Sequence, residues 1–273
     1  MRIFHKSGSI ITEFSDNVKK FSEESKNVTI LSGESLYIAT DFPFNHLYFN
    51  FGENVNAQPV NLSIKYHSNN DWVPVAYSTD GTLGFSQSGF IEFTPDKDES
   101  WDKESTNYGG DIIHDLSTIK VYDMYWVKIT FDADMDDVDF NWIGNLFSND
   151  TDLYSEFPIF ADQTFLTAFS AGKLDWKEQH VKASELIIQE LKRKNIIFGA
   201  EQILDRDILM PASVSKVAEI IYNAFGRDYN DNRDNARKEY DKRMDLSRYV
   251  IDTNDNAIKE PYEIKSSQGW LSR

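Results

Sequence analysis

Apolar and polar residues alternate in short runs through the first half of the chain. From Tyr125 to Phe131, the apolar residues Val127, Ile129 and Phe131 take every second position. This period of two is typical of a strand with one buried face. Strands are predicted in the same way over 29–31, 35–39, 46–51, 62–66, 73–77, 89–93, 120–122, 125–131 and 142–147, and 10–14 is compatible with an edge strand. Turn residues separate these runs, so we predict an antiparallel sandwich of about eight strands.

A helical period replaces the alternation after Ala171-Gly172. Apolar residues recur four apart within 174–195, which indicates a helix with one buried face. A second helix is predicted to begin near Pro211, a residue suited to a first turn, and to end before Gly226. A third is predicted over 232–249, where the charged residues leave only a narrow apolar stripe.

These patterns predict an α+β multidomain chain in three parts. The first is an antiparallel, jelly-roll-like β-sandwich over 1–170, the second a helical bundle over 171–249, and the third an extended tail over 250–273. Two folding units are expected to meet between residues 160 and 175. The apolar stretch 159–169 is interpreted as a last strand or a connection.

Charge is divided unequally along the chain. The net charge is −17, and residues 1–172 hold 27 Asp and Glu against 10 Lys and Arg, whereas the remainder holds 18 of each. Such an acidic first part argues against binding to a nucleic-acid backbone, so no sequence-specific binding of nucleic acid is expected. Cysteine is absent, which excludes thiol chemistry. No apolar run approaches the roughly 20 residues of a membrane helix, so no membrane is expected.

Catalytic motifs are not recognisable in the sequence. It contains no phosphate loop, dinucleotide-binding glycine motif or nucleophile elbow, and its five His are scattered. We therefore expect a protein that is not an enzyme. Asp132, Asp134 and Asp136 follow a strand and are interpreted as a calcium-binding loop or a solvated one. The run Asp252–Asn256 has the spacing of a calcium loop but lacks its glycine, so an Asx-rich turn is predicted there.

A first resemblance rests on two stretches. Residues 72–93 place Trp, Asp-Gly-Thr, Gly-Phe and Ser-Gly in order, and Tyr125–Phe131 supplies Tyr-Trp-Val-Lys-Ile. Over about the first 160 residues, this order of residues resembles the jelly-roll, galactose-binding-like domains of tailed-phage structural proteins. The resemblance implies a fold and carries little about function, because one fold hosts many roles.

A second resemblance covers 174–273. A helical hairpin, a charged third helix, the segment 246–256, Glu263 and a closing Arg273 are together similar to small head–tail adaptor (connector) proteins of tailed phages. The resemblance implies a virion protein that forms a homo-oligomeric ring beneath the portal and contacts portal, tail and neck proteins. That family has no catalytic residues. The large acidic domain before the helices is a departure from it.

Aromatic residues in the tail are candidate partner-binding anchors. The segment lacks a period, yet it holds Tyr262, Trp270 and the final Arg273, and Tyr249 lies just before it. A neighbouring subunit or the portal is expected to bury them. The alternative is a tail that packs on its own domain.

Two other functions stay open at this point. One is a carbohydrate- or receptor-binding virion module, and the other is a glycan-active enzyme with a carboxylate pair. Aromatic faces bind sugars by burying their C–H surface. The aromatics considered for such a platform are Trp72, Tyr77, Phe85, Trp101, Tyr108 and Trp142.

Overall fold

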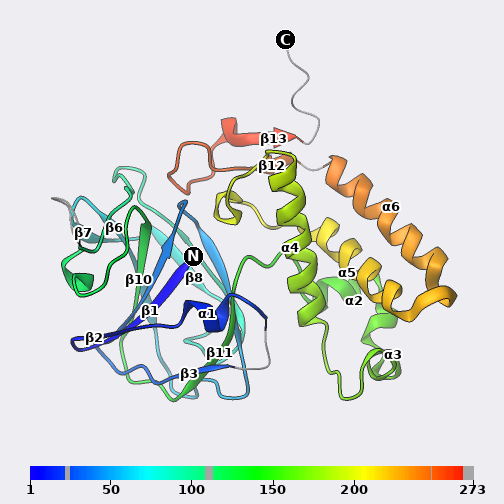
Figure 1. Cartoon of the computed structure of the whole chain (residues 1–273), viewed down its shortest axis with the longest axis horizontal. Coiled ribbons are helices and arrows are strands. Elements are labelled where there is room, and N and C mark those ends of the chain that lie inside the picture. The colour runs from blue at the N-terminus through cyan, green and yellow to red at the C-terminus, as the bar shows by residue number, and fades with distance from the viewer. Residues whose placement is uncertain (22–24, 108–112, 247, 267–273) are drawn as a thin grey trace, which may run out of the picture. The chain divides into compact units, whose positions relative to one another are not determined.

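The chain folds into two compact units of different construction. A computed structural model describes residues 1–21, 25–107, 113–246 and 248–266 (Figure 1). The first unit comprises 1–145 and 252–258, and the second comprises 146–251 and the chain from 259 onward. The first boundary therefore falls before the expected 160–175.

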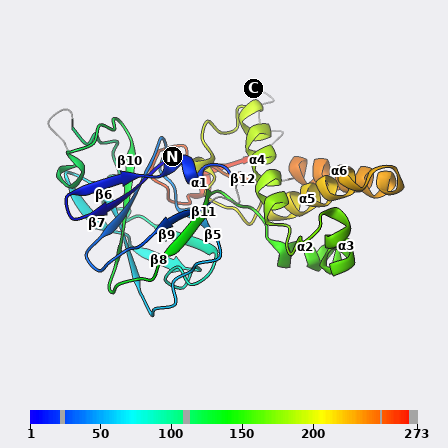
Figure 2. The same ribbon diagram turned by 60° about the horizontal axis from the view of Figure 1, so that its bottom comes forward.

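The first unit contains two antiparallel sheets. Their strand orders are β2-β1-β4-β10-β6-β7 and β3-β11-β5-β9-β8, and Figure 2 separates the labelled strands of the two sheets. The strands of the first sheet are β1 (Arg2–Ser7), β2 (Ile10–Glu13), β4 (Ser35–Thr40), β6 (Leu62–Ser68), β7 (Asp71–Pro74) and β10 (Tyr125–Phe131). Those of the second are β3 (Lys26–Val28), β5 (His46–Phe51), β8 (Tyr77–Asp80), β9 (Gly89–Thr94) and β11 (Val138–Gly144). Short helices α1 (Ser15–Val18) and η1 (His114–Leu116) accompany them.

Strand β4 is buried along its whole length, unlike a strand with one solvated face. It pairs with β1 on one side and with β10 on the other, with Ile38 opposite Val127. On one face, Tyr37 and Ala39 pack with Trp126, Ile113 and other residues of the 113–124 segment. The 113–124 segment covers one face of the first sheet. Side chains on both faces of β4 are therefore buried, and none of its positions is exposed.

Phe85 contacts both sheets from the loop between β8 and β9. Its side chain is fully buried, and its ring lies 5.3 Å from Phe131 on β10 and 5.5 Å from Phe140 on β11. Phe49 and Phe51 of β5 lie at 5.5 and 5.1 Å. The backbone of Phe85 has φ of 66°, a left-handed conformation that side chains disfavour. Burial of the ring offsets that local cost.

The second unit is mostly helical. Its elements are α2 (Asp150–Glu156), η2 (Pro158–Ala161), α3 (Gln163–Phe169), α4 (Lys177–Arg193), η3 (Ala200–Gln202), α5 (Met210–Phe225), η4 (Gly226–Tyr229), α6 (Asn230–Leu246), β12 (Arg248–Val250), η5 (Pro261–Glu263) and β13 (Ile264–Ser266). The predicted stripe is confirmed on α4, where Ala183, Ile187 and Leu191 are fully buried. Gly226 ends α5 at φ of 76°, which suits a residue without Cβ.

The interpretation of 159–169 as a strand is wrong. Phe160, Phe165 and Leu166 lie in η2 and α3 and pack with Trp176 and with α5 in one apolar core. The stretch is so rich in apolar residues that its period is not readable from sequence. The helical unit therefore begins at residue 146 and not at 171.

The tail differs from the extended segment that was expected. Strands β12 and β13 pair antiparallel, with Tyr249 opposite Lys265. Asp252 accepts hydrogen bonds from the backbone N–H groups of Asn256 and Ala257 at 3.2 and 2.8 Å. The predicted Asx-rich turn is thus confirmed. Its residues 252–258 belong to the first unit, whereas residues 259–266 belong to the second.

Within the described ranges, no helix has the length and apolar character needed to cross a membrane.

Candidate functional site

The expected tail anchors do not form one exposed set. Tyr249 is 2% exposed and belongs to the core of the second unit, where its hydroxyl donates to the Met244 carbonyl at 2.7 Å. In this structure Tyr249 is therefore a core residue and is not presented to a partner. Tyr262 is 68% exposed. Trp270 and Arg273 lie outside the described residues.

The acidic loop residues each hold a neighbouring loop. Asp132 accepts from the backbone and side-chain nitrogens of Asn61 at 2.8 Å each, and these bonds hold the pKa of its carboxyl below the usual value. Asp134 accepts from the Ser32 backbone N–H at 2.7 Å, and Asp136 accepts from the Ala57 backbone N–H. In the described chain, no three His, Cys, Asp or Glu side chains are placed to hold a metal ion together. Calcium binding stays a prediction.

The aromatics considered for a sugar platform are dispersed. Phe85, Trp101 and Trp142 are 0%, 5% and 5% exposed and lie in the core of the first unit. Trp72 is half-buried on β7, and Tyr77 is 65% exposed on β8. Tyr108 lies outside the described residues. The structure therefore does not bring these rings together on one surface.

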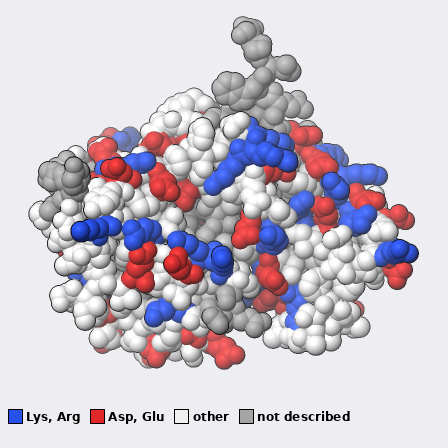
Figure 3. Space-filling view, in the orientation of Figure 1, with Lys and Arg blue, Asp and Glu red and all other residues white. Residues whose placement is uncertain are grey.

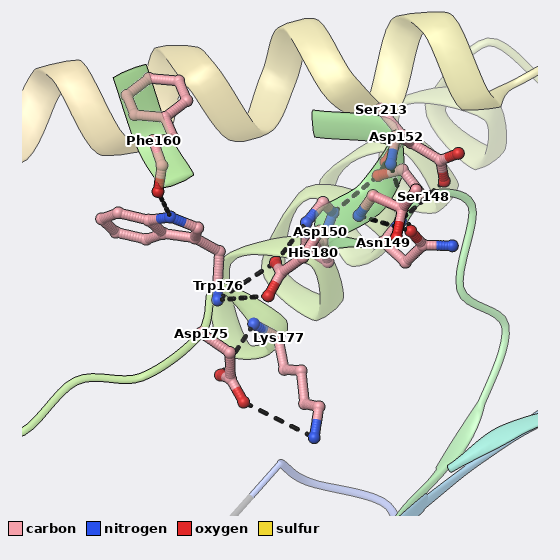
Figure 4. Close-up of polar contacts among 11 residues, drawn as sticks. Ser148, Asn149, Asp150, Asp152, Phe160, Asp175, Trp176, Lys177, His180 and Ser213 are labelled. Carbon is pink, nitrogen blue, oxygen red and sulfur yellow. Dashed lines mark hydrogen bonds and ion pairs between the residues drawn. The ribbon is translucent and has the colours of Figure 1, made fainter. Parts of the chain in front are cut away.

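A Ser-His-Asp chain connects three helices of the second unit (Figure 4). Ser148 Oγ lies 2.8 Å from His180 Nδ1 on α4, and His180 Nε2 lies 3.1 Å from Asp150 Oδ1 at the start of α2. Ser213 Oγ of α5 lies 2.7 Å from Ser148 Oγ. With the carboxylate as acceptor, His180 donates from Nε2 and accepts the Ser148 hydroxyl at Nδ1.

Burial decides what this chain can do. Ser148, His180 and Ser213 are 2%, 1% and 0% exposed, and the Ser148 hydroxyl is already hydrogen-bonded on both sides. A nucleophile has to meet its substrate, and this hydroxyl is enclosed, so what the geometry shows is a set of hydrogen bonds that joins α2, α4 and α5. Asp150 extends it by accepting from the Trp176 backbone N–H at 3.2 Å, just before α4 begins.

A second buried polar pair lies in the first unit. His67 Nδ1 is 2.7 Å from Glu104 Oε2, a close contact without hydrogen-bond alignment, and both side chains are nearly inaccessible. The His67 ring meets the edge of Trp72 at 4.9 Å, and Trp126 Nε1 donates to the Glu104 carbonyl. The bond from Trp126 fastens Glu104 to β10, and the His67 contact places the Glu104 side chain beside β6.

An open pocket of about 270 Å³ lies between α4, α5 and α6. Its lining consists of Leu186, Gln189, Glu190, Arg193, Lys216 and Tyr240. On α4, Leu186, Gln189 and Arg193 are three, four or seven apart and share one helix face, and Glu190 lies beside them, four residues after Leu186 and three before Arg193. Unlike the Ser-His-Asp chain, this pocket exposes charged groups to solvent, and it is the candidate binding site of the helical unit.

The groups in this pocket are already oriented. Lys216 Nζ lies 4.4 Å from the centre of the Tyr240 ring and 2.8 Å from Glu219 Oε2. The Tyr240 hydroxyl donates to Glu190, which also pairs with Lys194 at 2.7 Å. Burial works against ionisation of Glu190, but the bonds from Lys194 and Tyr240 outweigh it and lower its pKa. Burial, with Glu190 adjacent, raises the pKa of Tyr240.

Sequence reasoning did not find this pocket. Its α4 residues share a predicted helix, but Lys216 and Tyr240 reach it only through the packing of α5 and α6. The Ser-His-Asp chain was missed for the same reason, since Ser148 and His180 belong to no local motif.

Comparisons with known proteins supply no relative. No family model, no curated protein and no solved structure matches the chain. What the protein does has to be inferred from its own residues and geometry.

Proposed function

We propose that this protein is a structural component of a tailed-phage virion, a head–tail connector that forms a ring between the portal and the tail. In this proposal the two sheets of the first unit are a jelly-roll sandwich and the helices of the second are the adaptor bundle. The protein acts by assembly with portal, tail and neck proteins and is not an enzyme. It is assembled in the host cytoplasm and resides in the virion.

The observation that carries the proposal is the exposure of apolar side chains after the helices. Tyr262 and Ile264 are 68% and 52% exposed in η5 and β13, although Ile251 and Glu263 beside them are buried. Each exposed apolar group forfeits roughly 25 cal/mol per Å² of surface that a partner would bury. The segment of η5 and β13 belongs to the second unit, so its exposed apolar side chains are held in place and are suited to a contact with another subunit.

Replacing the two exposed apolar residues tests the proposal. Tyr262→Ser together with Ile264→Thr changes only exposed side chains, so the variant is expected to keep the melting temperature of the full chain. Virions grown with this variant are expected to lack the protein or the tail, whereas full-length protein is located at the neck by cryo-electron microscopy. Location at a fibre tip or on the capsid surface would contradict the connector role. So would a Tyr262→Ser, Ile264→Thr chain incorporated at normal stoichiometry.

A receptor-binding virion module is the second candidate. It is favoured by Tyr77 and Leu83, which are 65% and 63% exposed at and near the edge strand β8. Glycan-array binding that is lost in Tyr77→Ala, with the fold intact by circular dichroism, would support this candidate against the connector.

A further inference from the structure

We propose that the pocket between α4, α5 and α6 receives an acidic side chain from the first unit of a second copy of this chain. The inference rests on the proposed ring and names the contact that would build it.

The pocket offers donors that the chain itself does not use. The side chains of Gln189 and Arg193 are exposed on α4, and neither makes a hydrogen bond or a close ion pair with any other described residue, although Arg193 acts electrostatically on Glu190. They are four residues apart and therefore project side by side from one helix face. A guanidinium beside an amide matches the two oxygens of a carboxylate. Leu186 supplies an apolar wall one turn earlier.

The charge left in the pocket is positive. Glu190 is neutralised by Lys194, and Lys216 keeps donors beyond the one that contacts Glu219. Arg193 lies in the last turn of α4, and basic side chains gather over this end of the helix in Figure 3. A helix C-terminus favours such cations, which holds them in place without neutralising them fully.

Of the two units, the first carries the excess of negative charge that complements this pocket. It holds 25 Asp and Glu against 10 Lys and Arg, whereas the second unit holds 20 against 18. Two first units repel each other, so the favourable contact between copies pairs the acidic unit of one with the basic pocket of the next. Because the two surfaces differ, the contact is heterologous, and a heterologous contact repeats into a ring when its rotation closes and into an open filament when it does not.

Matched charge reversals on α4 test the contact. Arg193→Glu changes the pocket, and Lys192→Glu makes the same charge change at the neighbouring exposed residue, which does not line it. Sedimentation velocity of the full chain is run across protein concentration at low and high salt. The wild type and Lys192→Glu are expected to self-associate alike and to dissociate with salt. The dissociation constant of Arg193→Glu is expected to be at least about fivefold higher than that of the wild type. The variant loses a partly exposed charge pair and adds a repulsion between two carboxylates.

Cross-linking identifies the partner surface. Carbodiimide treatment of an equal mixture of ¹⁴N- and ¹⁵N-labelled chains is expected to join Lys216 to a carboxylate of 1–145 in mixed-label peptides. A chain that stays monomeric would overturn the inference, and so would equal loss of association in both variants. Mixed-label links from Lys216 only to residues of the second unit would also overturn it, by showing that helical units meet each other. These results concern contact between copies in solution, so they can fail while neck location in the virion stands.

Discussion

Replacing Phe85 tests whether one ring holds the two sheets of the first unit together. Phe85→Ala removes a fully buried ring with four aromatic neighbours between 5.1 and 5.5 Å. Phe-to-Ala changes in cores cost about 3–5 kcal/mol, and each ring pair adds about 0.5–1.5 kcal/mol beyond burial. We expect a loss in the upper part of that range.

The backbone provides an internal check on this reasoning. At φ of 66°, Ala keeps a left-handed strain of about 1–2 kcal/mol that Gly avoids. The greater freedom of Gly in the unfolded chain costs only about 0.5–1 kcal/mol. Phe85→Gly is therefore expected to be as stable as Phe85→Ala or slightly more stable.

Urea unfolding with hydrogen exchange read by mass spectrometry assigns the loss to the first unit. Leu83 is the matched control, because it has φ of 52° in the same turn but is 63% exposed. Leu83→Ala is expected to change the free energy of unfolding by less than about 0.5 kcal/mol. A loss under about 1 kcal/mol for Phe85→Ala, or a glycine variant clearly weaker than the alanine variant, would refute the account.

Three further predictions concern the helices and the charges. Ile187→Asp and Ile221→Asp place a charge at fully buried positions and are expected to cost several kcal/mol in thermal or urea unfolding, whereas Leu174→Asp at a 78% exposed site is not. The pKa of Glu190 is lowered from its ordinary 4.5, so its contribution is present above that value and is lost as pH falls through the folded pKa. The stability difference between wild type and Glu190→Gln is thus expected to shrink between about pH 5 and pH 3, and a constant difference would show that Glu190 is not held ionised. Duplex DNA is expected to bind only weakly at physiological salt, and a submicromolar, salt-sensitive anisotropy signal would disprove this.

Regular periods made much of the fold predictable. His46–Phe51 and Tyr125–Phe131 are strands with the predicted bounds, and α4 and α5 lie within or close to their predicted ranges. The errors fall where the period is weak. The predicted strand over 73–77 is divided between β7 and β8, and no strand is formed over 120–122.

The candidate sites were less predictable, because they depend on long-range packing. Tyr249 looked like a partner anchor because it ends a charged predicted helix, but the core that buries it includes Ile187 and Ile203 from distant segments. The acidic loop was identifiable as a cluster, yet its hydrogen bonds to Asn61 and Ser32 could not be read from spacing. Charge balance and helix faces were readable, and they now support the inference about the pocket.

The return of residues 252–258 to the first unit has a consequence for biosynthesis. A ribosome releases the chain from its N-terminus, so all of 1–145 emerges long before the segment that completes this unit. Asp252, which is fully buried there, can be enclosed only after α6 has been made. The first unit is therefore expected to wait, incomplete, until almost the entire chain has left the exit tunnel. A nascent chain stalled before residue 252 should then be more sensitive to protease within 1–145 than one stalled after the tail has emerged.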